Sequence, residues 1–278
     1  MDDYKKLIEE AFGESSEDSD DDDRLRQPED SNISGEPELL FGKLPEWERI
    51  SEIKGLSLCR DFLTPHQQST LLASILQQGV KARARLDSSF ISEARAQLEE
   101  GWFTDASHNQ AMRFGDLPAW ANELSTCIRE LIQYSNYDPE STDITSEMNG
   151  QDCIFPSTLL NREPLFNQLI ANSYQPGGIC AHVDLMRFED GIALISLESS
   201  CVMHFSRVEN KAVTDRKQPE PKIPVYLTPG SLLLISGEAR YQWKHEINRK
   251  PGFQIWDGLE IVQKRRTSIT LRRLCNSE

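Results

Sequence analysis

The sequence predicts a mainly β domain, a sandwich or barrel of short strands, with flanking α-helices and an acidic N-terminal tail. After residue 167, short β-branched and apolar runs alternate with turn-forming residues, as in strand-rich folds. Two earlier segments carry apolar residues at helical spacing. Residues 1–38 hold 15 of the 45 acidic residues but only 4 of the 30 basic ones.

The charge distribution separates the tail from the domain. The 278-residue chain has a net charge of -15, of which residues 1–38 contribute -11, and this leaves -4 for residues 39–278. A nearly neutral domain disfavours a broadly basic nucleic-acid coat but allows a local positive groove. We therefore expect a disordered acidic tail at residues 1–38 and one folded domain at residues 39–278.

The cysteines and the apolar runs bear on the cellular compartment. The six cysteines include no C-x-x-C pair, which disfavours both a disulfide framework and a structural zinc site. No secretory signal and no apolar run of membrane length is evident. We therefore expect reduced thiols in a soluble protein of the cytoplasm, the nucleus or both.

The tail contains one amphipathic segment. Tyr4, Leu7 and Ile8 lie at helical spacing, and the acidic run at residues 14–23 follows them. A block of this composition cannot bury enough apolar surface to fold alone, which favours a solubilising tail. The alternative is that residues 2–12 dock as a helix in a groove of a protein partner.

Two helices are predicted before the strands. The first begins at Pro65, because Thr64 and Gln67 form a capping box around that position, and it ends at Gly79. The second runs from residue 118 to about residue 134. Their apolar faces consist of Leu71, Leu72 and Ile75 in the first helix, and of Trp120, Leu124, Ile128, Leu131 and Ile132 in the second.

Five candidate strands follow, at Ile192–Leu197, Cys201–Val208, Val225–Leu227, Ser231–Ile235 and Ser268–Leu274. Turns are predicted at residues 176–178 and at Pro229-Gly230. Residues 209–224, rich in Lys, Pro and Glu, are predicted to form a surface loop. The mixed stretch at residues 81–115 interleaves arginines with aromatic residues such as Phe114, which favours ordinary packing over contact with a substrate.

Histidines and one aspartate form a candidate metal site. Alternate residues of a strand share a face, so His182 and Asp184 would project together about 7 Å apart and could converge on one ion. A second imidazole would complete a two-His, one-carboxylate site, which suits non-haem Fe(II) oxygenases. His245 is the best candidate for this third ligand, whereas His204, within an apolar run, is interpreted as structural.

The C-terminal strand offers a candidate anion site. Arg266, Ser268, Thr270 and Arg272 share one face of it. Guanidinium groups that point into an apolar barrel are costly unless an anion neutralises them, and arginine suits bidentate binding of a carboxylate. A dicarboxylate cosubstrate would meet that need. The alternative places the arginines on the outer face, with Thr267, Ile269 and Leu271 inward.

Several segments together carry a resemblance to a known family. They are the N-x-Y and H-x-D motifs within residues 172–184, and residues 196–203, 229–232, 237–245 and 266–272. In order and spacing they resemble the AlkB-like family of Fe(II)- and 2-oxoglutarate-dependent dioxygenases, over about residues 109–274. The resemblance implies a double-stranded β-helix (jelly-roll) core at residues 167–274, with a helical and lid part at residues 39–166.

The resemblance also implies the roles of individual residues. Fe(II) would be held by His182, Asp184 and His245. The cosubstrate 2-oxoglutarate would be contacted by Asn172, Tyr174, Arg266 and Arg272. Among these, Arg266 would clamp the distal carboxylate of 2-oxoglutarate, and Arg272 would also support the metal-bound aspartate.

The implied reaction consumes O2 and converts 2-oxoglutarate to succinate and CO2 while a C–H bond is hydroxylated. When that carbon is an N-methyl group, formaldehyde leaves and the product is demethylated. The implied substrate is an alkylated nucleobase in RNA or DNA. The alternatives are a protein side-chain hydroxylase or demethylase of the same chemistry, and a non-catalytic binding module on the same fold.

Two departures from the family pattern bear on the substrate and the cosubstrate. Ser268 stands where the family usually has Asn, which loosens one contact to the cosubstrate. Met186 stands where repair members have an acidic residue that recognises the damaged base, and this favours RNA over DNA.

Arg240, upstream of His245, is predicted with equal weight to reach the substrate mouth or to make a surface ion pair.

Overall fold

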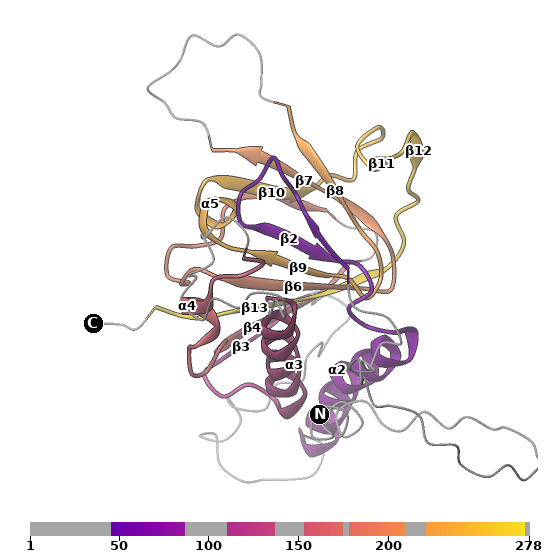
Figure 1. Ribbon diagram of the computed structural model, residues 1–278. Coiled ribbons are helices and arrows are strands. Elements are labelled where there is room, and N and C mark those ends of the chain that lie inside the picture. The colour runs from indigo at the N-terminus through magenta and orange to yellow at the C-terminus, as the bar shows by residue number, and fades with distance from the viewer. Residues whose placement is uncertain (1–45, 87–109, 137–152, 175–177, 209–220, 276–278) are drawn as a thin grey trace, which may run out of the picture.

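The computed structural model describes residues 46–86, 110–136, 153–174, 178–208 and 221–275, and the side chains of these residues except 76–86 (Figure 1). Several predictions therefore lie outside the described residues. They concern the tail at 1–38 with its segment 2–12, the turn residues 176–177, and residues 209–220 of the predicted loop.

Within the described residues, two antiparallel sheets face one another (Figure 1). The seven-stranded large sheet has the order β1-β2-β9-β6-β13-β4-β3, with β1 at Trp47–Arg49, β2 at Leu56–Cys59, β3 at Gln110–Phe114, β4 at Gln168–Tyr174, β6 at Ile192–Leu197, β9 at Leu232–Ile235 and β13 at Arg266–Arg272. The four-stranded small sheet has the order β5-β10-β7-β8, with β5 at Ile179–His182, β7 at Cys201–Arg207, β8 at Ile223–Leu227 and β10 at Trp243–Ile247. A separate hairpin consists of β11 at Ile255–Trp256 and β12 at Leu259–Glu260.

The chain passes repeatedly between the two sheets. Strand β4 lies in the large sheet, β5 in the small one, β6 in the large one and β7 in the small one, and β9, β10 and β13 alternate in the same way. This exchange of strands is typical of a jelly roll. The predicted mainly β fold with a double-stranded β-helix core is confirmed.

Helices α2 (Pro65–Leu86) and α3 (Ala119–Ser135) cover the face of the large sheet that points away from the small sheet (Figure 1). Their buried residues form one apolar cluster with the sheet residues Leu169, Ala193, Ile195, Leu234 and Ile269. A second cluster lies between the sheets and includes Leu58, Leu194, Met203, Phe205 and Leu233. The central strands of the large sheet are therefore buried on both faces.

No described helix combines the length and the apolar character that a membrane crossing requires.

The helices begin as predicted, but one ends later. The backbone N–H of Thr64 donates to Gln67 Oε1 (2.8 Å), and the backbone N–H of Gln67 donates to Thr64 Oγ1 (3.3 Å), so the capping box is present. The predicted stop at Gly79 is wrong, because α2 continues to Leu86. A glycine inside a helix costs only about 1 kcal/mol relative to alanine, and the residues that follow are mostly good helix formers.

The predicted strands are present with shifted ends, except that β6 has the predicted bounds. Strand β8 begins at Ile223, inside the predicted loop, and β13 begins at Arg266 and ends at Arg272. Strands β1–β3 join the large sheet although they precede residue 167, where the strand-rich core was predicted to begin. Strands β1 and β2 are only three and four residues long, too short to show an alternation of apolar and polar residues. Strand β3 is exposed along one face and lacks a strong apolar pattern. Two short helices, α4 (Ser157–Leu160) and α5 (Gly237–Tyr241), complete the described elements.

The six thiols are free and differ in burial. Cys59, Cys127 and Cys201 are buried, whereas Cys180 and Cys275 are exposed. Burial raises the pKa of Cys59 and of Cys127 to about 12, and it also raises the pKa of Cys201. Since the thiolate is the nucleophile, the buried cysteines should be inert.

A short pulse of iodoacetamide at mildly alkaline pH is expected to alkylate Cys180 and Cys275 and to spare Cys59, Cys127 and Cys201. Peptide mass spectrometry measures the labelled fraction at each position. The same pulse in urea is the control and should label every cysteine. Native labelling of Cys59 at the rate of Cys180 would contradict the packing described above.

Candidate metal centre and cosubstrate site

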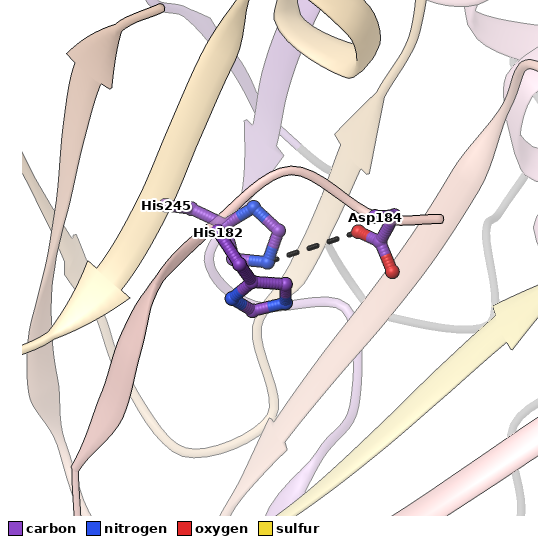
Figure 2. A group of neighbouring side chains, drawn as sticks. All are labelled: His182, Asp184 and His245. Carbon is purple, nitrogen blue, oxygen red and sulfur yellow. Dashed lines mark ion pairs between the residues drawn. The ribbon is translucent and has the colours of Figure 1, made fainter. Parts of the chain in front are cut away.

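The register of two neighbouring strands brings two histidines together. His182, at the end of β5, lies directly opposite His245 of β10, and the centroids of their rings are 4.3 Å apart (Figure 2). Gly178, just before β5, allows this close pairing, since a Cβ at that position would lie 2.5 Å from the carbonyl oxygen of Ile247. The two imidazoles therefore come from distant parts of the sequence but share one face of the small sheet.

Asp184 joins the two histidines from a loop. The H-x-D spacing suggested that Asp184 shares a strand face with His182. Strand β5 ends at His182, however, so Asp184 lies beyond the strand. Its Oδ2 atom is 3.8 Å from His245 Nε2 (Figure 2). One potential ligand atom from each of the three residues lies within 4.8 Å of the others. Two imidazoles and one carboxylate are a donor set that fits Fe(II) with open positions.

Both imidazoles can present a free lone pair to a metal. His182 Nδ1 lies 2.8 Å from the carbonyl oxygen of Cys180, so this nitrogen acts as the donor and leaves Nε2 for a metal. Burial lowers the pKa of His245 to about 4, although the neighbouring Asp184 carboxylate opposes the shift. His245 is therefore neutral near pH 7, and metal binding there need not release a proton from it.

A buried arginine holds the side chain of Asp184. Arg272 Nη1 donates to Asp184 Oδ1 at 2.5 Å, and both side chains are buried. The guanidinium also lies 4.3 Å from the ring centroid of Phe188. Because a buried carboxylate is costly without a partner, this pair stabilises the charge that a metal ligand needs.

Arg266 has unused donors in the interior. Its side chain is 4% exposed, and Nε donates to Ser196 Oγ at 3.0 Å. Nη1 and Nη2 are buried and have no hydrogen-bond partner among the described residues. Buried donors without partners are rare, and this pair is suited to a carboxylate of 2-oxoglutarate. The alternative that the arginines of β13 lie outward is wrong, because Arg266 and Arg272 are buried. Ile269 and Leu271, on the opposite face of β13, pack in the cluster beneath the helices, so the two arginines point between the sheets.

Asn172 and Tyr174 lie on β4 beside β13. Tyr174 pairs with Arg266 and Asn172 with Ser268. Burial raises the pKa of Tyr174, and the charge of Arg266 and a hydrogen bond with the Ser268 side chain partly offset this rise. Asn172 is buried, and its Oδ1 accepts a hydrogen bond of 2.7 Å from Nε2 of Gln110. This bond leaves the Asn172 amide nitrogen available to another acceptor.

Sequence reasoning missed two residues of this region and misjudged another. Gln110 holds Asn172 from β3, and nothing in its sequence context indicated that role. Ser196 belonged to the segments that carry the family resemblance, but its bond to Arg266 was not foreseen. Both interpretations of Arg240 are wrong, because its side chain is buried and bonds to backbone carbonyls.

His204 lies apart from the metal group. It is on β7 opposite Glu246, and its ring packs edge-on against Phe253 at 6.1 Å between centroids. The described residues that could hold a metal together are His182, Asp184 and His245, without His204. This position agrees with the structural role expected for His204.

A jelly roll with a two-His, one-carboxylate group beside a buried arginine with free donors has the features of a non-haem iron oxygenase that uses a carboxylate cosubstrate. Residues 55–272 match the family model described as the 2OG-Fe(II) oxygenase superfamily, and the chain belongs to this superfamily. It is a 2-oxoglutarate-dependent dioxygenase, with Fe(II) as its metal and 2-oxoglutarate and O2 as cosubstrates.

Two curated relatives and one solved structure show what the chain is similar to. It is 31% identical over 236 residues to the "Alkylated DNA repair protein ALKBH8 homolog" of Arabidopsis thaliana, covering 81% of this chain and 59% of that protein. It is 26% identical over 250 residues to "tRNA (carboxymethyluridine(34)-5-O)-methyltransferase alkbh8" of Xenopus tropicalis, covering 80% of this chain and 32% of that protein. The structure of OsALKBH1 aligns with 79% of this chain and 98% of that chain, at 16% identity and a TM-score of 0.46.

The relatives confirm the AlkB-like resemblance inferred from residues 109–274. The chain spans less than two thirds of the length of both the Arabidopsis and the Xenopus relative. Its similarity to them therefore concerns the oxygenase region and not those proteins as wholes.

Replacing either His182 or Asp184 by alanine is expected to abolish tight Mn²⁺ binding, because each change removes one of three converging ligands. Calorimetric titration of the metal-free protein under anaerobic conditions measures the affinity. His204→Ala is the matched control and should bind Mn²⁺ like the unchanged protein. A loss of affinity in His204→Ala equal to that in His182→Ala would contradict the assigned ligand group.

Arg266→Met is expected to weaken 2-oxoglutarate binding by roughly 10- to 100-fold, since hydrogen bonds to a charged group contribute about 1.5–3 kcal/mol. The thermal shift that 2-oxoglutarate induces in the Mn²⁺-loaded protein measures the effect. Mn²⁺ affinity without 2-oxoglutarate should stay unchanged, because Arg266 bonds to Ser196 and not to Asp184. An unaltered response to 2-oxoglutarate would show that the carboxylate binds elsewhere.

Proposed function

We propose that this oxygenase acts on an alkylated nucleobase in a nucleic acid, with RNA ahead of DNA, and removes an N-methyl group as formaldehyde. In this proposal His182, Asp184 and His245 hold Fe(II), which supplies the oxidation of the C–H bond together with O2 and 2-oxoglutarate. Asn172, Tyr174, Arg266 and Arg272 bind and orient the cosubstrate.

The observation that carries the nucleic-acid proposal is the similarity to the Arabidopsis relative, whose name refers to the repair of alkylated DNA. The name of the Xenopus relative refers to tRNA. The matches cover 81% and 80% of this chain, so the similarity extends over most of the oxygenase domain.

An exposed aromatic residue beside Arg187 supports the same substrate class. Phe114 of β3 is 47% exposed, although packing in the core was the favoured interpretation of its sequence context. The guanidinium of Arg187, three residues after Asp184, lies 5.8 Å from its ring centroid. Exposed aromatic rings beside arginine are typical of surfaces on which single-stranded bases stack.

Met186 supports RNA ahead of repaired DNA. Its side chain is 71% exposed and has no carboxylate to offer to a damaged base. Base selection would then depend on stacking and shape, which is how proteins recognise the splayed bases of single-stranded RNA.

Two further predictions from the sequence stay predictions: location in the cytoplasm, the nucleus or both, and a protein partner for residues 2–12.

The test incubates the pure protein with Fe(II), ascorbate, 2-oxoglutarate and matched pairs of methylated and unmethylated RNA and DNA oligonucleotides. The proposal predicts equal yields of formaldehyde and succinate with a methylated RNA and little with its unmethylated partner. His182→Ala should abolish both products, because it removes a proposed iron ligand.

Succinate without formaldehyde on every oligonucleotide would contradict a nucleic-acid substrate. In that case, mass spectrometry of co-purified proteins for the gain of one oxygen or the loss of one methyl group would identify the protein-directed alternative. The net charge of only -4 over residues 39–278 is compatible with a peptide substrate. Membership of the oxygenase superfamily argues against the third alternative, a non-catalytic module.

A further inference from the structure

Arg240 is a buried arginine whose contacts differ from those of Arg266 and Arg272. Its side chain is 2% exposed and comes from α5. Nη1 donates to the carbonyl oxygen of Asp184 at 3.0 Å, and Nη2 donates to those of Leu185 at 2.8 Å and Phe188 at 3.0 Å. The guanidinium therefore bonds three times to the backbone of one short loop.

The loop bonded by Arg240 includes a proposed metal ligand. Residues 184–188 follow the end of β5 and form no strand. An isolated β-bridge between Phe188 and Leu274 holds the far end of this loop, with the backbone N–H of Cys275 donating to the carbonyl of Arg187 at 2.8 Å, but residues 184–186 take part in no sheet ladder. Within the loop, the backbone N–H of Phe188 donates to the carbonyl of Leu185 at 3.1 Å. Buried carbonyl groups without a donor are costly, and the planar guanidinium can satisfy several of them at once.

Two arginines hold Asp184 from different sides. Arg272 binds the carboxylate and Arg240 binds the backbone carbonyl of the same residue. An ion pair alone leaves the backbone free to move, whereas the two contacts together restrict both ends of the residue.

The position of Arg240 in the chain links two of the proposed ligands. His245 lies five residues after Arg240, on β10, which follows α5 almost directly. One short segment therefore supplies the imidazole of His245 and the donors that hold the Asp184 loop. The distance between these two ligands depends on that segment.

We propose that Arg240 is a positioning residue of the metal centre, which fixes the Asp184 carboxylate relative to His245 by binding the backbone of residues 184–188. It contacts neither the proposed metal ligand atoms nor the proposed cosubstrate site. The inference rests on the proposed ligand roles of His182, Asp184 and His245. It accounts for a buried guanidinium whose described hydrogen bonds all go to uncharged carbonyl groups.

The test measures Mn²⁺ affinity by calorimetry without 2-oxoglutarate or substrate, in Arg240→Met and in Arg240→Lys. Residues that support metal ligands typically change metal affinity by about 10- to 100-fold, and Arg240→Met should lie in this range. Arg240→Lys should lose less, because its single ammonium can replace only part of the three-carbonyl contact. Hydrogen exchange of the metal-free protein should become faster at residues 184–189 in both variants and stay unchanged in β13.

The matched control is Arg162→Met. Arg162 also donates to a backbone carbonyl, that of Asp190 at 2.7 Å, and it pairs with Glu189 at 3.3 Å, but it does not reach Asp184. This variant should lower stability without a change in Mn²⁺ affinity. An equal loss of affinity in Arg162→Met and Arg240→Met would show a general effect of stability and would overturn the inference.

The positioning role of Arg240 would also be overturned if the Arg240→Met variant folds and both its Mn²⁺ affinity and its hydrogen exchange equal those of the unchanged protein. If Arg240→Met does not fold, the same criteria apply to Arg240→Lys, which retains the charge and most of the side-chain volume. Failure of the underlying ligand assignment gives a different result, since Mn²⁺ binding would then survive in His182→Ala as well.

Discussion

The buried ion pair between Arg272 and Asp184 is the contact on which the site depends. It joins the two sheets, because Arg272 belongs to β13 of the large sheet and Asp184 follows β5 of the small one. A carboxylate can stay charged in the interior only when such a partner compensates for its loss of hydration. The same face of β13 also carries Arg266, so one strand supports the proposed metal ligand and the proposed cosubstrate site.

Much of the candidate site could be predicted from the sequence, because its residues lie in short motifs with fixed spacing. The H-x-D motif and the separated His245 indicated a metal group, and the structure brings these three residues together. The role of Arg240 could not be predicted in this way. Spacing identifies which side chains share a face, but it does not show which backbone carbonyls of a loop a side chain from another element will bond.

The fold was predictable to a similar degree. Strand β6 and helix α3 have strong apolar patterns and appear close to their predicted bounds. The alternating pattern of β13 separated its two faces but could not decide which one points between the sheets, because helices bury the opposite face as well. Strand β3 was missed, since an edge strand with exposed residues lacks a clear apolar period.

Strand β5 has a consequence for the protein without its metal. It contains only four residues, lies at the end of the small sheet and pairs with β10 alone among the described strands. Short terminal strands fray easily, and an open strand edge can recruit other chains. A metal bound through His182 would fasten this strand to its neighbour. Loss of the metal would then leave the position of this strand to its backbone pairing with β10.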